Sequence, residues 1–532
     1  MKARLNFACV VLSLAMWLPA SAYDFMVDGI AYNVNSDGKT VTVTYTERRK
    51  STNYDQITEA IIPSMVVNPA TGVSYTVTTI GESAFYSNKT ITKLVIPPTI
   101  VTMEKDAFGS SLSKSSLYIS DLAKWCAINF ANATSNPFYS QMPFYLNDEL
   151  VNDLIIPKGV AVMNSFAFHR CKSLKTLKIE ADVPSISRDA FSSCSNLTTV
   201  EITGNVSRLD SSAFHLCSKM ASITLPESVD TIGPEAFASC SSLTEFICPP
   251  NLRGISRETF KQCSKLQRIV LGPKIEKIGQ SAFHQCKQLT EINFPNTLCA
   301  IGINAFQNCT SLENIDLPIL CSDIRHNAFD NTKWYANQPE GIVYAGYVAY
   351  DYKGDMPANY HLVLRDSIVG IAQYAFYNQK NLEKITLPFT MFDLGGWCFS
   401  QCSNLKEVRC RMHHPILTPS QYNLYGAWAV FLNVNLSNVK LIVPKGCKPY
   451  YTQTYEWNQF GEIVEESFPV GDVTGDMLVD VEDVNALINI ILKFNTVNDY
   501  AGEADVNSSG IVDVVDVNGV INIILGLNIF DQ

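Results

Sequence analysis

The feature that most constrains this chain is a phenylalanine that recurs at intervals of 23 residues through the middle third of the sequence. A cysteine follows three residues after seven of these phenylalanines, and a leucine or methionine comes three residues later. The phenylalanines are Phe168, Phe191, Phe214, Phe237, Phe260, Phe283, Phe306 and Phe329. A fixed period of this length indicates one supersecondary unit stacked on copies of itself. Because no single unit can bury its own apolar face, the stack must form the core.

The order of residues within one repeat predicts a strand and a return segment. Ile292, Asn293 and Phe294 alternate as a strand with one buried face does, and Pro295 ends that strand. Residues 301–306 return the chain, and Phe306 is expected to fill the interior. We expect neighbouring strands to lie about 4.8 Å apart in parallel register.

The repeats resemble the BspA-like class of leucine-rich repeat, a family of bacterial surface proteins. The resemblance rests on residues 232–243, which read Ile-Gly-Pro-Glu-Ala-Phe-Ala-Ser-Cys-Ser-Ser-Leu, and on a second copy at 301–318; it covers roughly residues 23–465. It implies a curved, right-handed repeat solenoid with a parallel β-sheet face and short helical or irregular return segments. It also implies a protein that binds partners without catalysis, since the family is associated with adhesion to host matrix proteins and other bacteria.

Residues 1–22 have the three parts of a secretory signal peptide. Lys2 and Arg4 provide the positive start, residues 7–18 are apolar, and small residues end at Ala22. A membrane anchor is the alternative, but it requires a longer apolar stretch. We expect cleavage near Ala22 and a secreted or cell-surface protein with no membrane span in the mature chain.

The remaining sequence divides into a cap, a repeat region and a tail. Before the first repeat, turn residues separate segments in which apolar and polar residues alternate as in strands. This pattern predicts a β cap over the open edge of the stack. Two insertions interrupt the repeats; they form loops on a binding face or plug the stack with their aromatic side chains. Within the first insertion, residues 122–130 are expected to form a short helix. The predicted segments are 23–79 (cap), 80–465 (solenoid), 115–160 and 331–365 (insertions), 466–471 (linker) and 472–532 (tail).

The tail contains two near-copies of a twelve-residue segment, and each copy precedes an apolar, helix-like run. Oxygen side chains at positions 1, 3, 5, 9 and 12, with a backbone carbonyl at position 7, suit the six to eight oxygen ligands of Ca²⁺. An acidic helical hairpin without metal is the alternative. The predicted ligands are Asp472, Thr474, Asp476, Leu478, Asp480 and Asp483 in the first loop, and Asp505, Asn507, Ser509, Ile511, Asp513 and Asp516 in the second.

These loops resemble those of a type I dockerin, a small all-α domain with two EF-hand-like calcium loops. The resemblance implies two Ca²⁺ ions and a cohesin-type partner recognised through loop positions 10 and 11. Those positions are Val481 and Glu482 in the first loop and Val514 and Val515 in the second, and they do not match the common Ser-Thr pair. The residues that depart from the usual ligand and turn pattern are Thr474, Met477 and Ser509.

The cysteines and histidines suggest packing rather than chemistry. Disulfides are the first expectation for a secreted chain. Seven cysteines, however, share one repeat position with parallel Cβ directions, which does not permit a bond. We therefore expect buried thiols. The sequence contains no Cys-x-x-Cys pair, which is the spacing that would indicate a metal site. His169, His215 and His284 share a repeat position but stand too many repeats apart to hold one metal.

The outward strand positions are the candidate ligand surface of the solenoid. Aligned by the repeat period, one column reads Lys178, Glu201, Thr224, Ile247, Val270, Asn293 and Asp316. Ile247 and Val270 would form an exposed apolar spot flanked by charge, which can mark an interaction site. Scattered surface residues are the alternative.

Charge and motifs narrow the function. A net charge of −11 disfavours a nucleic-acid partner, and no phosphate loop, nucleophile elbow or paired carboxylates indicate an enzyme. We expect a non-enzymatic, adhesin-like protein that binds matrix proteins, other bacteria or glycans through the solenoid and a cohesin through the tail. The alternative is a non-catalytic component of a polysaccharide-degrading complex, since dockerins are commonly joined to glycoside hydrolases.

Overall fold

The computed structural model describes residues 22–47, 54–109, 112, 114–417, 429–475, 478–493 and 504–527 of the chain. It contains two compact units: unit 1 comprises residues 1–152 and 164–173, and unit 2 comprises residues 153–163 and 174–532. The predicted signal peptide lies outside the described residues except for Ala22. Among the described helices, none has the length and apolar character needed to cross a membrane.

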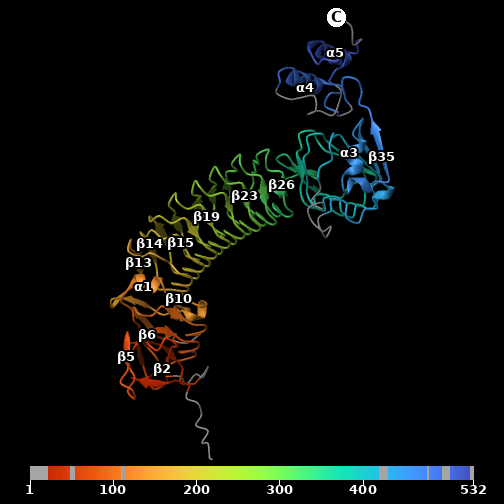
Figure 1. Cartoon of the computed structure of the whole chain (residues 1–532). Helices are drawn as coiled ribbons and strands as arrows, with labels where there is room; N and C mark the ends of the chain where they lie inside the picture. The colour runs from red at the N-terminus through yellow and green to blue at the C-terminus, as the bar shows by residue number, and fades with distance from the viewer. Residues whose placement is uncertain are drawn as a thin grey trace, which may run out of the picture. The chain divides into compact units, whose positions relative to one another are not determined.

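Unit 1 contains two sheets that combine parallel and antiparallel strands; several of their strands are labelled in Figure 1. In the first sheet, β1 to β3 are antiparallel neighbours, β3, β6, β8 and β10 are parallel, and β5 pairs antiparallel with β6. Its strands are β1 (Phe25–Val27), β2 (Ile30–Val34), β3 (Thr40–Thr44), β5 (Met65–Val67), β6 (Ser74–Ile80), β8 (Thr102–Met103) and β10 (Asn129–Phe130). The second sheet has the order β12 (Glu149–Leu150), β11 (Phe144–Leu146), β9 (Ser116–Ile119), β7 (Lys93–Ile96) and β4 (Glu59–Ile61).

The helix expected at residues 122–130 is only partly correct. Helix α1 spans Leu122–Cys126 and ends at the C-cap residue Ala127, and Asn129–Phe130 forms β10. Strand β10 pairs with β8 and buries Phe130. The parallel repeat pattern therefore resumes before a longer helix can form.

The strands of unit 2 form two rows of parallel pairs, one on each side of the repeat. The first row is β13 (Asp153–Ile156), β14 (Thr176–Ile179), β16 (Thr199–Ile202) and β18 (Ser222–Thr224), then β20 (Glu245–Ile247), β22 (Arg268–Val270) and β24 (Glu291–Ile292). The second is β15 (Ser185–Ile186), β17 (Arg208–Leu209) and β19 (Thr231–Ile232), then β21 (Gly254–Ile255), β23 (Lys277–Ile278), β25 (Ala300–Ile301) and β26 (Asp323–Ile324). The predicted parallel β-solenoid is thus confirmed.

The later repeats of unit 2 continue this arrangement after a hairpin. Strands β27 (Gly341–Ala345) and β28 (Val348–Lys353) are antiparallel, and β28 pairs in parallel with β30 (Gly370–Ile371), which pairs with β32 (Asp393–Leu394). The last sheet has the order β29 (Tyr360–Val363), β31 (Leu382–Leu387), β33 (Glu407–Cys410), β34 (Lys440–Pro444) and β35 (Glu462–Glu466). Short helices α2 (Lys333–Ala336) and α3 (Lys448–Gln453) interrupt the strands.

The repeat phenylalanines form a continuous internal stack in unit 2. From Phe191 to Phe329 each ring is fully buried. Neighbouring rings such as Phe283 and Phe306 lie 5.0 Å apart and nearly parallel, at 8°. The register places each strand residue opposite the one 23 positions later, as with Thr176 and Thr199. The predicted inward position of these phenylalanines is therefore confirmed.

The repeat cysteines are buried thiols, as expected. All fifteen cysteines in the described part of the chain are free, and only Cys299 is more than slightly exposed. The Cys217 thiol donates to the Phe191 carbonyl at 3.2 Å, and Cys309 donates to Phe283 at 3.0 Å. Burial raises the pKa of Cys217 to about 12, so the thiol stays protonated and unreactive.

The insertions place aromatic side chains against the stack. Trp334 and Tyr350 lie 5.4 and 5.7 Å from the Phe329 ring, and Phe138 of the first insertion lies 6.2 Å from Phe168. These contacts match the alternative in which the insertions plug the stack. An interruption of the repeats would leave apolar area exposed on Phe329 and Phe168. The aromatic side chains of the insertions cover that area.

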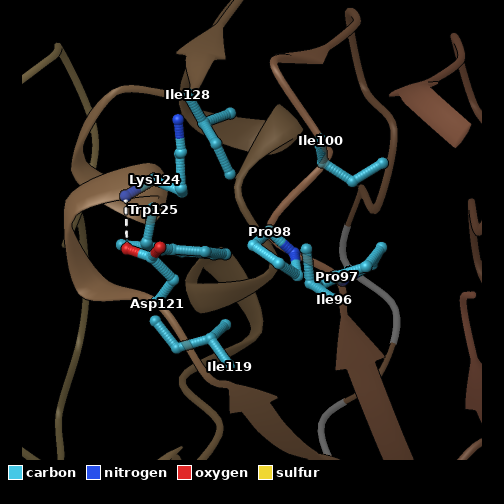
Figure 2. Close-up of a pocket in the computed structure, with 9 residues that line it drawn as sticks. All are labelled: Ile96, Pro97, Pro98, Ile100, Ile119, Asp121, Lys124, Trp125 and Ile128. Atoms are coloured by element: carbon cyan, nitrogen blue, oxygen red, sulfur yellow. Dashed lines mark hydrogen bonds between the residues drawn. The ribbon is translucent and has the colours of Figure 1, made fainter. Parts of the chain in front are cut away.

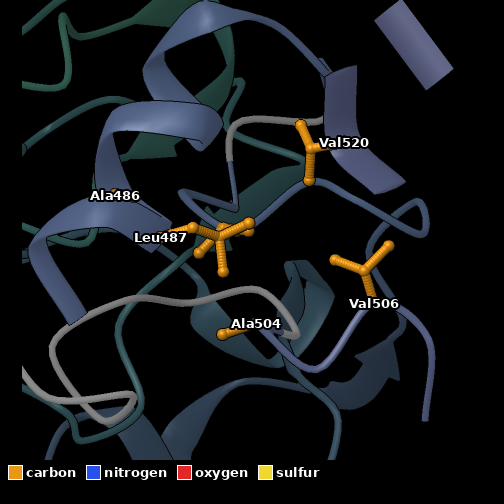
Figure 3. Packing of buried hydrophobic residues seen from close by; sticks show 6 residues of the cluster. Ala486, Leu487, Ala504, Val506 and Val520 are labelled. Carbon is orange, nitrogen blue, oxygen red and sulfur yellow. The ribbon is translucent and has the colours of Figure 1, made fainter. Parts of the chain in front are cut away.

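The described part of the tail contains helices α4 (Val481–Ile491) and α5 (Val514–Ile524). Each begins with a capping box, formed by Asp480 with Asp483 and by Asp513 with Asp516. A small apolar core joins the two repeats of the tail (Figure 3). Its buried residues are Val473, Ala486, Leu487, Ala504, Val506 and Val520.

Candidate functional site

The predicted ligand column lies on the outer side of the strand row in unit 2. Lys178 is in register with Glu201, and Ile247 is in register with Val270. Ile247 is 63% exposed and Val270 is half-buried. Asn293 and Asp316 follow further along the repeats and are exposed. Ligand binding by this column remains a prediction.

Polar groups along this face of unit 2 pair with one another. Lys178 forms an ion pair with Glu180 at 3.0 Å, and this contact raises the pKa of Lys178. Arg268 bridges Glu245 and Glu291 on the neighbouring strands. Each exposed pair contributes little to stability because solvent screens it. A ligand would have to break these pairs before it could use their charges.

Asn293 is also occupied by the repeat itself. Its side-chain oxygen accepts from the Leu271 amide at 2.8 Å, and its side-chain nitrogen donates to the Leu271 carbonyl at 3.1 Å. Both hydrogen bonds continue the pairing of β22 and β24 by one residue beyond the end of each strand. The side chain therefore has a clear structural role in the position where a ligand contact was predicted.

The corresponding face of unit 1 carries a row of residues that the sequence analysis missed. One outward position on five neighbouring strands is apolar or aromatic throughout, because the register aligns these residues directly. The two end members are 54% and 49% exposed, and the three between them are half-buried. We call this row the apolar stripe; its members are Ile61, Val95, Tyr118, Tyr145 and Leu150.

The centre of the apolar stripe is aromatic and carries a cation. The Tyr118 and Tyr145 rings lie 4.5 Å apart at 12°, and the Lys93 ammonium lies 5.0 Å from the centre of the Tyr118 ring. Such a cation is attracted by the negative ring face. No carboxylate of the described residues lies within ion-pair distance of Lys93, although Glu59 is its register partner.

A narrow recess beside this sheet is too small to be a ligand site (Figure 2). It is lined by apolar residues that include Ile96, Pro97 and Trp125, and its volume is about 10 Å³. The Asp121 carboxylate closes one side by accepting from the Lys124 amide at 2.9 Å, which caps α1. A space of this size holds about one water molecule.

The first tail loop fixes its last acidic residue with two backbone bonds. The Asp483 carboxylate accepts from the Thr474 amide at 2.9 Å and from the Asp480 amide at 2.8 Å. The Asp480 carboxylate accepts from the Glu482 amide at 2.8 Å. Positions 3, 9 and 12 of the loop are therefore drawn together.

The second tail loop repeats this pattern. The Asp516 carboxylate accepts from the Asn507 amide at 3.2 Å and the Asp513 amide at 2.8 Å. The Asp505 carboxylate accepts from the Ser509 and Gly510 amides at 2.9 and 2.6 Å. The Ile511 carbonyl, predicted as a ligand, accepts from the Ser509 hydroxyl at 3.0 Å.

The donor atoms of the first loop suit a hard cation. Asp472 and Asp483 are fully buried, and the buried Thr474 hydroxyl has no hydrogen-bond partner within the described residues. A buried hydroxyl without a partner is costly, and a bound cation would satisfy it. Carboxylate, hydroxyl and carbonyl oxygens are the ligands that Ca²⁺ prefers. Leu478, whose carbonyl was predicted to complete the set, is exposed.

Two further findings concern the predicted metal ligands. Asp476 lies outside the described residues. In the part of the chain that the structure describes, no three His, Cys, Asp or Glu side chains are grouped as a metal site. The predicted docking residues Val481, Val514 and Val515 are 57–65% exposed at the helix starts, and Glu482 is exposed beside them.

The fold and the repeat pattern define a leucine-rich-repeat solenoid, and comparison with known families specifies which kind. The family profile described as a BspA type leucine-rich repeat region of six copies matches four segments of this chain, residues 70–136, 141–267, 207–336 and 358–447. These segments cover more than half of the sequence, so the chain belongs to the BspA-type leucine-rich-repeat family. No curated protein matches it.

Similar solved structures are bacterial leucine-rich-repeat proteins. One from Bacteroides ovatus is 20% identical, with a TM-score of 0.40, covering 80% of this chain and all of that one. A cell surface protein from Faecalibacterium prausnitzii is 19% identical, with a TM-score of 0.38 and coverages of 77% and 98%. The pneumococcal vaccine antigen PcpA is 16% identical, with a TM-score of 0.37 and coverages of 84% and 99%.

Proposed function

We propose that this chain is a secreted or cell-surface, non-enzymatic binding protein that contacts a protein ligand through the apolar stripe of unit 1. Membership of a family of surface repeat proteins, which are typically non-catalytic, supports the general role. The apolar stripe is the single observation that supports the more specific proposal, binding of a protein ligand through unit 1. Leaving Ile61 and Leu150 half exposed has no benefit to an isolated unit, whereas exposed apolar rows commonly mark interaction surfaces.

The stripe has the composition of the centre of a protein interface. Tyrosine is enriched among the residues that dominate binding energy, and such anchors are surrounded by a polar rim. Glu59, Ser116 and Glu149 on the same strands supply polar or charged neighbours. Five strands spaced at about 4.8 Å make a row about 19 Å long, which suits the anchor region of an interface.

The ring geometry favours a protein over a sugar at the stripe. The Tyr118 and Tyr145 rings face each other, and Lys93 lies over Tyr118. A sugar ring stacks on an open aromatic face, and these contacts occupy the Tyr118 ring and the Tyr145 face turned toward it. Apolar side chains can pack on the ring edges, and a carboxylate of the partner can pair with Lys93. The proposed ligand is therefore a protein surface with an apolar centre and an acidic residue.

Binding of the full chain to immobilised host matrix proteins tests this proposal. The double variant Tyr118→Ala/Tyr145→Ala should weaken the measured affinity at least tenfold, because it removes both aromatic anchors. The matched control is Thr176→Ala/Thr199→Ala, which changes an exposed, register-paired couple on β14 and β16. Equal affinity of the tyrosine variant and the control would contradict the proposed site.

We also propose that the tail binds two Ca²⁺ ions and docks a cohesin-type partner through Val481, Glu482, Val514 and Val515. The matching bonds in the two loops and the unpartnered Thr474 hydroxyl support the metal sites. Calcium at a hundred times its dissociation constant should stabilise each site by about 2.7 kcal/mol. Bound Ca²⁺ would fix the loops that begin α4 and α5 and so the surface offered to the partner.

Calorimetric melting of the full chain with Ca²⁺ and with a chelator tests the metal proposal. Chelation should lower the melting temperature of the tail transition. Thr474→Val should weaken calcium binding while Thr474→Ser retains it, because only serine keeps the ligand oxygen. A tail transition that ignores calcium would count against the metal sites. Capture of a purified cohesin by the calcium-bound tail would in turn favour a role in a polysaccharide-degrading assembly.

A further inference from the structure

One column of unit 2 changes character in its last repeats. The residue two positions before each repeat phenylalanine has a left-handed backbone, with φ between 53° and 65°. In the earlier repeats of unit 2 this residue is small or polar: Asp189, Ser212, Glu235, Glu258, Ser281, Asn304 and Asn327, whereas the repeat of Phe168, in unit 1, has Phe166 at 65°. In the later repeats it is Tyr374, at 65°, and Trp397, at 59°.

Bulky side chains are uncommon in this conformation, and such strained positions cluster at functional sites. Asparagine and aspartate tolerate the left-handed region best, which explains the residues of the earlier repeats. Tyr374 and Trp397 tolerate the left-handed conformation less well than asparagine or aspartate. They occupy two repeats that are adjacent in the stack, since β30 pairs with β32. The substitution therefore needs a reason other than the turn itself.

The two aromatic residues belong to a cluster that reaches the surface. The Tyr374 ring lies 5.0 Å from Trp397 at 31°, and it meets Tyr377 and His326 edge-on at 5.2 Å each. Tyr377 is 40% exposed, and the other three are half-buried. We call these four residues the aromatic shelf.

Hydrogen-bonding groups lie among the rings of the aromatic shelf. The His326 Nδ1 donates to the Gln373 side-chain oxygen at 3.1 Å, because an amide oxygen can only accept. This bond leaves Nε2 of a neutral His326 as an acceptor. No hydrogen bond from the described residues reaches that nitrogen. The exposed Asn327 and the two tyrosine hydroxyls provide further donors and acceptors.

We propose that the aromatic shelf is a binding site for a neutral saccharide. One face of a sugar ring presents C–H groups, which pack on the negative face of an aromatic ring. Its hydroxyls need donors and acceptors at the ring edge, and His326, Asn327 and the tyrosines provide both. The ligand is neutral because the neighbouring cation Arg325 is already paired with Asp323 at 2.6 Å.

This site belongs to unit 2 and the apolar stripe to unit 1; it takes a different ligand class and does not depend on the protein-binding role proposed above. The stripe has two tyrosine rings stacked face to face and a cation at its centre. The aromatic shelf has tilted and edge-on rings interspersed with neutral polar groups. The same chain thus combines two kinds of exposed aromatic cluster.

Calorimetric titration of the full chain with cellobiose, lactose and N,N′-diacetylchitobiose tests the saccharide site. We expect saturable binding of at least one disaccharide. Tyr374→Asn and Trp397→Asn should weaken it at least tenfold and keep the fold, because asparagine occupies this position in two earlier repeats. Tyr377→Ser is a second variant that keeps the fold, since serine stands at the equivalent position in Ser192 and Ser400.

Phe392→Ala is the matched control, because Phe392 is 57% exposed in the same repeats but is not part of the shelf. It should leave saccharide affinity unchanged. Failure of all three sugars to bind the wild-type chain would overturn the proposal. So would unchanged affinity in Tyr374→Asn and Tyr377→Ser. A shelf variant that loses a matrix protein while no sugar binds would indicate a protein contact and also overturn it.

Discussion

The outer strand faces of unit 1 and unit 2 have the same backbone pattern but differ in side-chain character. In unit 1 the aligned row contains Ile61, Tyr118 and Tyr145, with Lys93 unpaired by any described carboxylate. In unit 2 the equivalent column mixes polar residues with exposed apolar ones such as Ile247, and Arg268 and Lys178 are held in ion pairs. The inward residues maintain the stack in both units, so the outward residues are free to differ. Function can therefore be confined to a few repeats of a uniform fold.

The largest expected effect is a loss of stability when an inward phenylalanine, the feature that both units share, is truncated. Phe260→Ala in unit 2 and Phe108→Ala in unit 1 should each lower the free energy of unfolding by about 3–5 kcal/mol, because a cavity remains in a close-packed stack. Both rings are fully buried and stacked on neighbours at 5.4 Å. Denaturant unfolding measures the effect. A loss below about 1 kcal/mol in either unit would mean that its stack is not close-packed.

The next largest effect is a change in ligand affinity when an outward lysine of either unit is replaced. Lys93→Glu should weaken binding of the protein ligand about tenfold, equivalent to about 1.4 kcal/mol, because a carboxylate of the partner would meet a like charge. Lys178→Glu makes the same change in unit 2 and should leave affinity within about twofold, since Lys178 is already paired with Glu180. Surface plasmon resonance with the full chain compares the two. A larger effect from Lys178 would reverse the assignment of the binding face.

The smallest effect concerns an acidic pair of unit 2, Asp330 at the start of the insertion and Asp351 within it. Burial raises the pKa of Asp351 and of Asp330 above the usual carboxyl value of about 4. A raised folded-state pKa favours the protonated form, so its stabilising contribution is complete below pH 4 and declines as the pH rises through the raised value. Asp351→Asn should flatten unit 2 stability between pH 4 and 7. Denaturant unfolding at each pH measures this, and an unchanged slope would contradict it.

The solenoid could be predicted from the sequence because the same residue pattern recurs every 23 residues. A phenylalanine every 23 residues fixes both the strand register and the interior of the stack, and the cysteines at one repeat position could be assigned as buried thiols. Plugging of the stack by the insertions was also the favoured interpretation of the sequence, and Trp334 and Tyr350 pack on Phe329 in this way. The helix at residues 122–130 was overestimated, because pairing of β10 with β8 took its last residues.

The apolar stripe could not be predicted in the same way. Its members Ile61, Val95, Tyr118 and Tyr145 are separated by 34, 23 and 27 residues. Only one of these intervals equals the repeat period, so alignment by period cannot bring the residues together. The alternation of apolar residues in β9 and β11 was the available signal, but it gives no register between strands. Pairing across the insertion supplied that register.

Tyrosine footprinting of the full chain with and without a bound matrix protein tests the central claim most directly. Acetylation of tyrosine hydroxyls, measured by mass spectrometry, reports which rings the ligand covers. We predict protection at Tyr118 and Tyr145, while exposed Tyr347 in unit 2 reacts equally in both states. Full reactivity of Tyr118 and Tyr145 in the complex would contradict the claim that the stripe is the ligand-binding face.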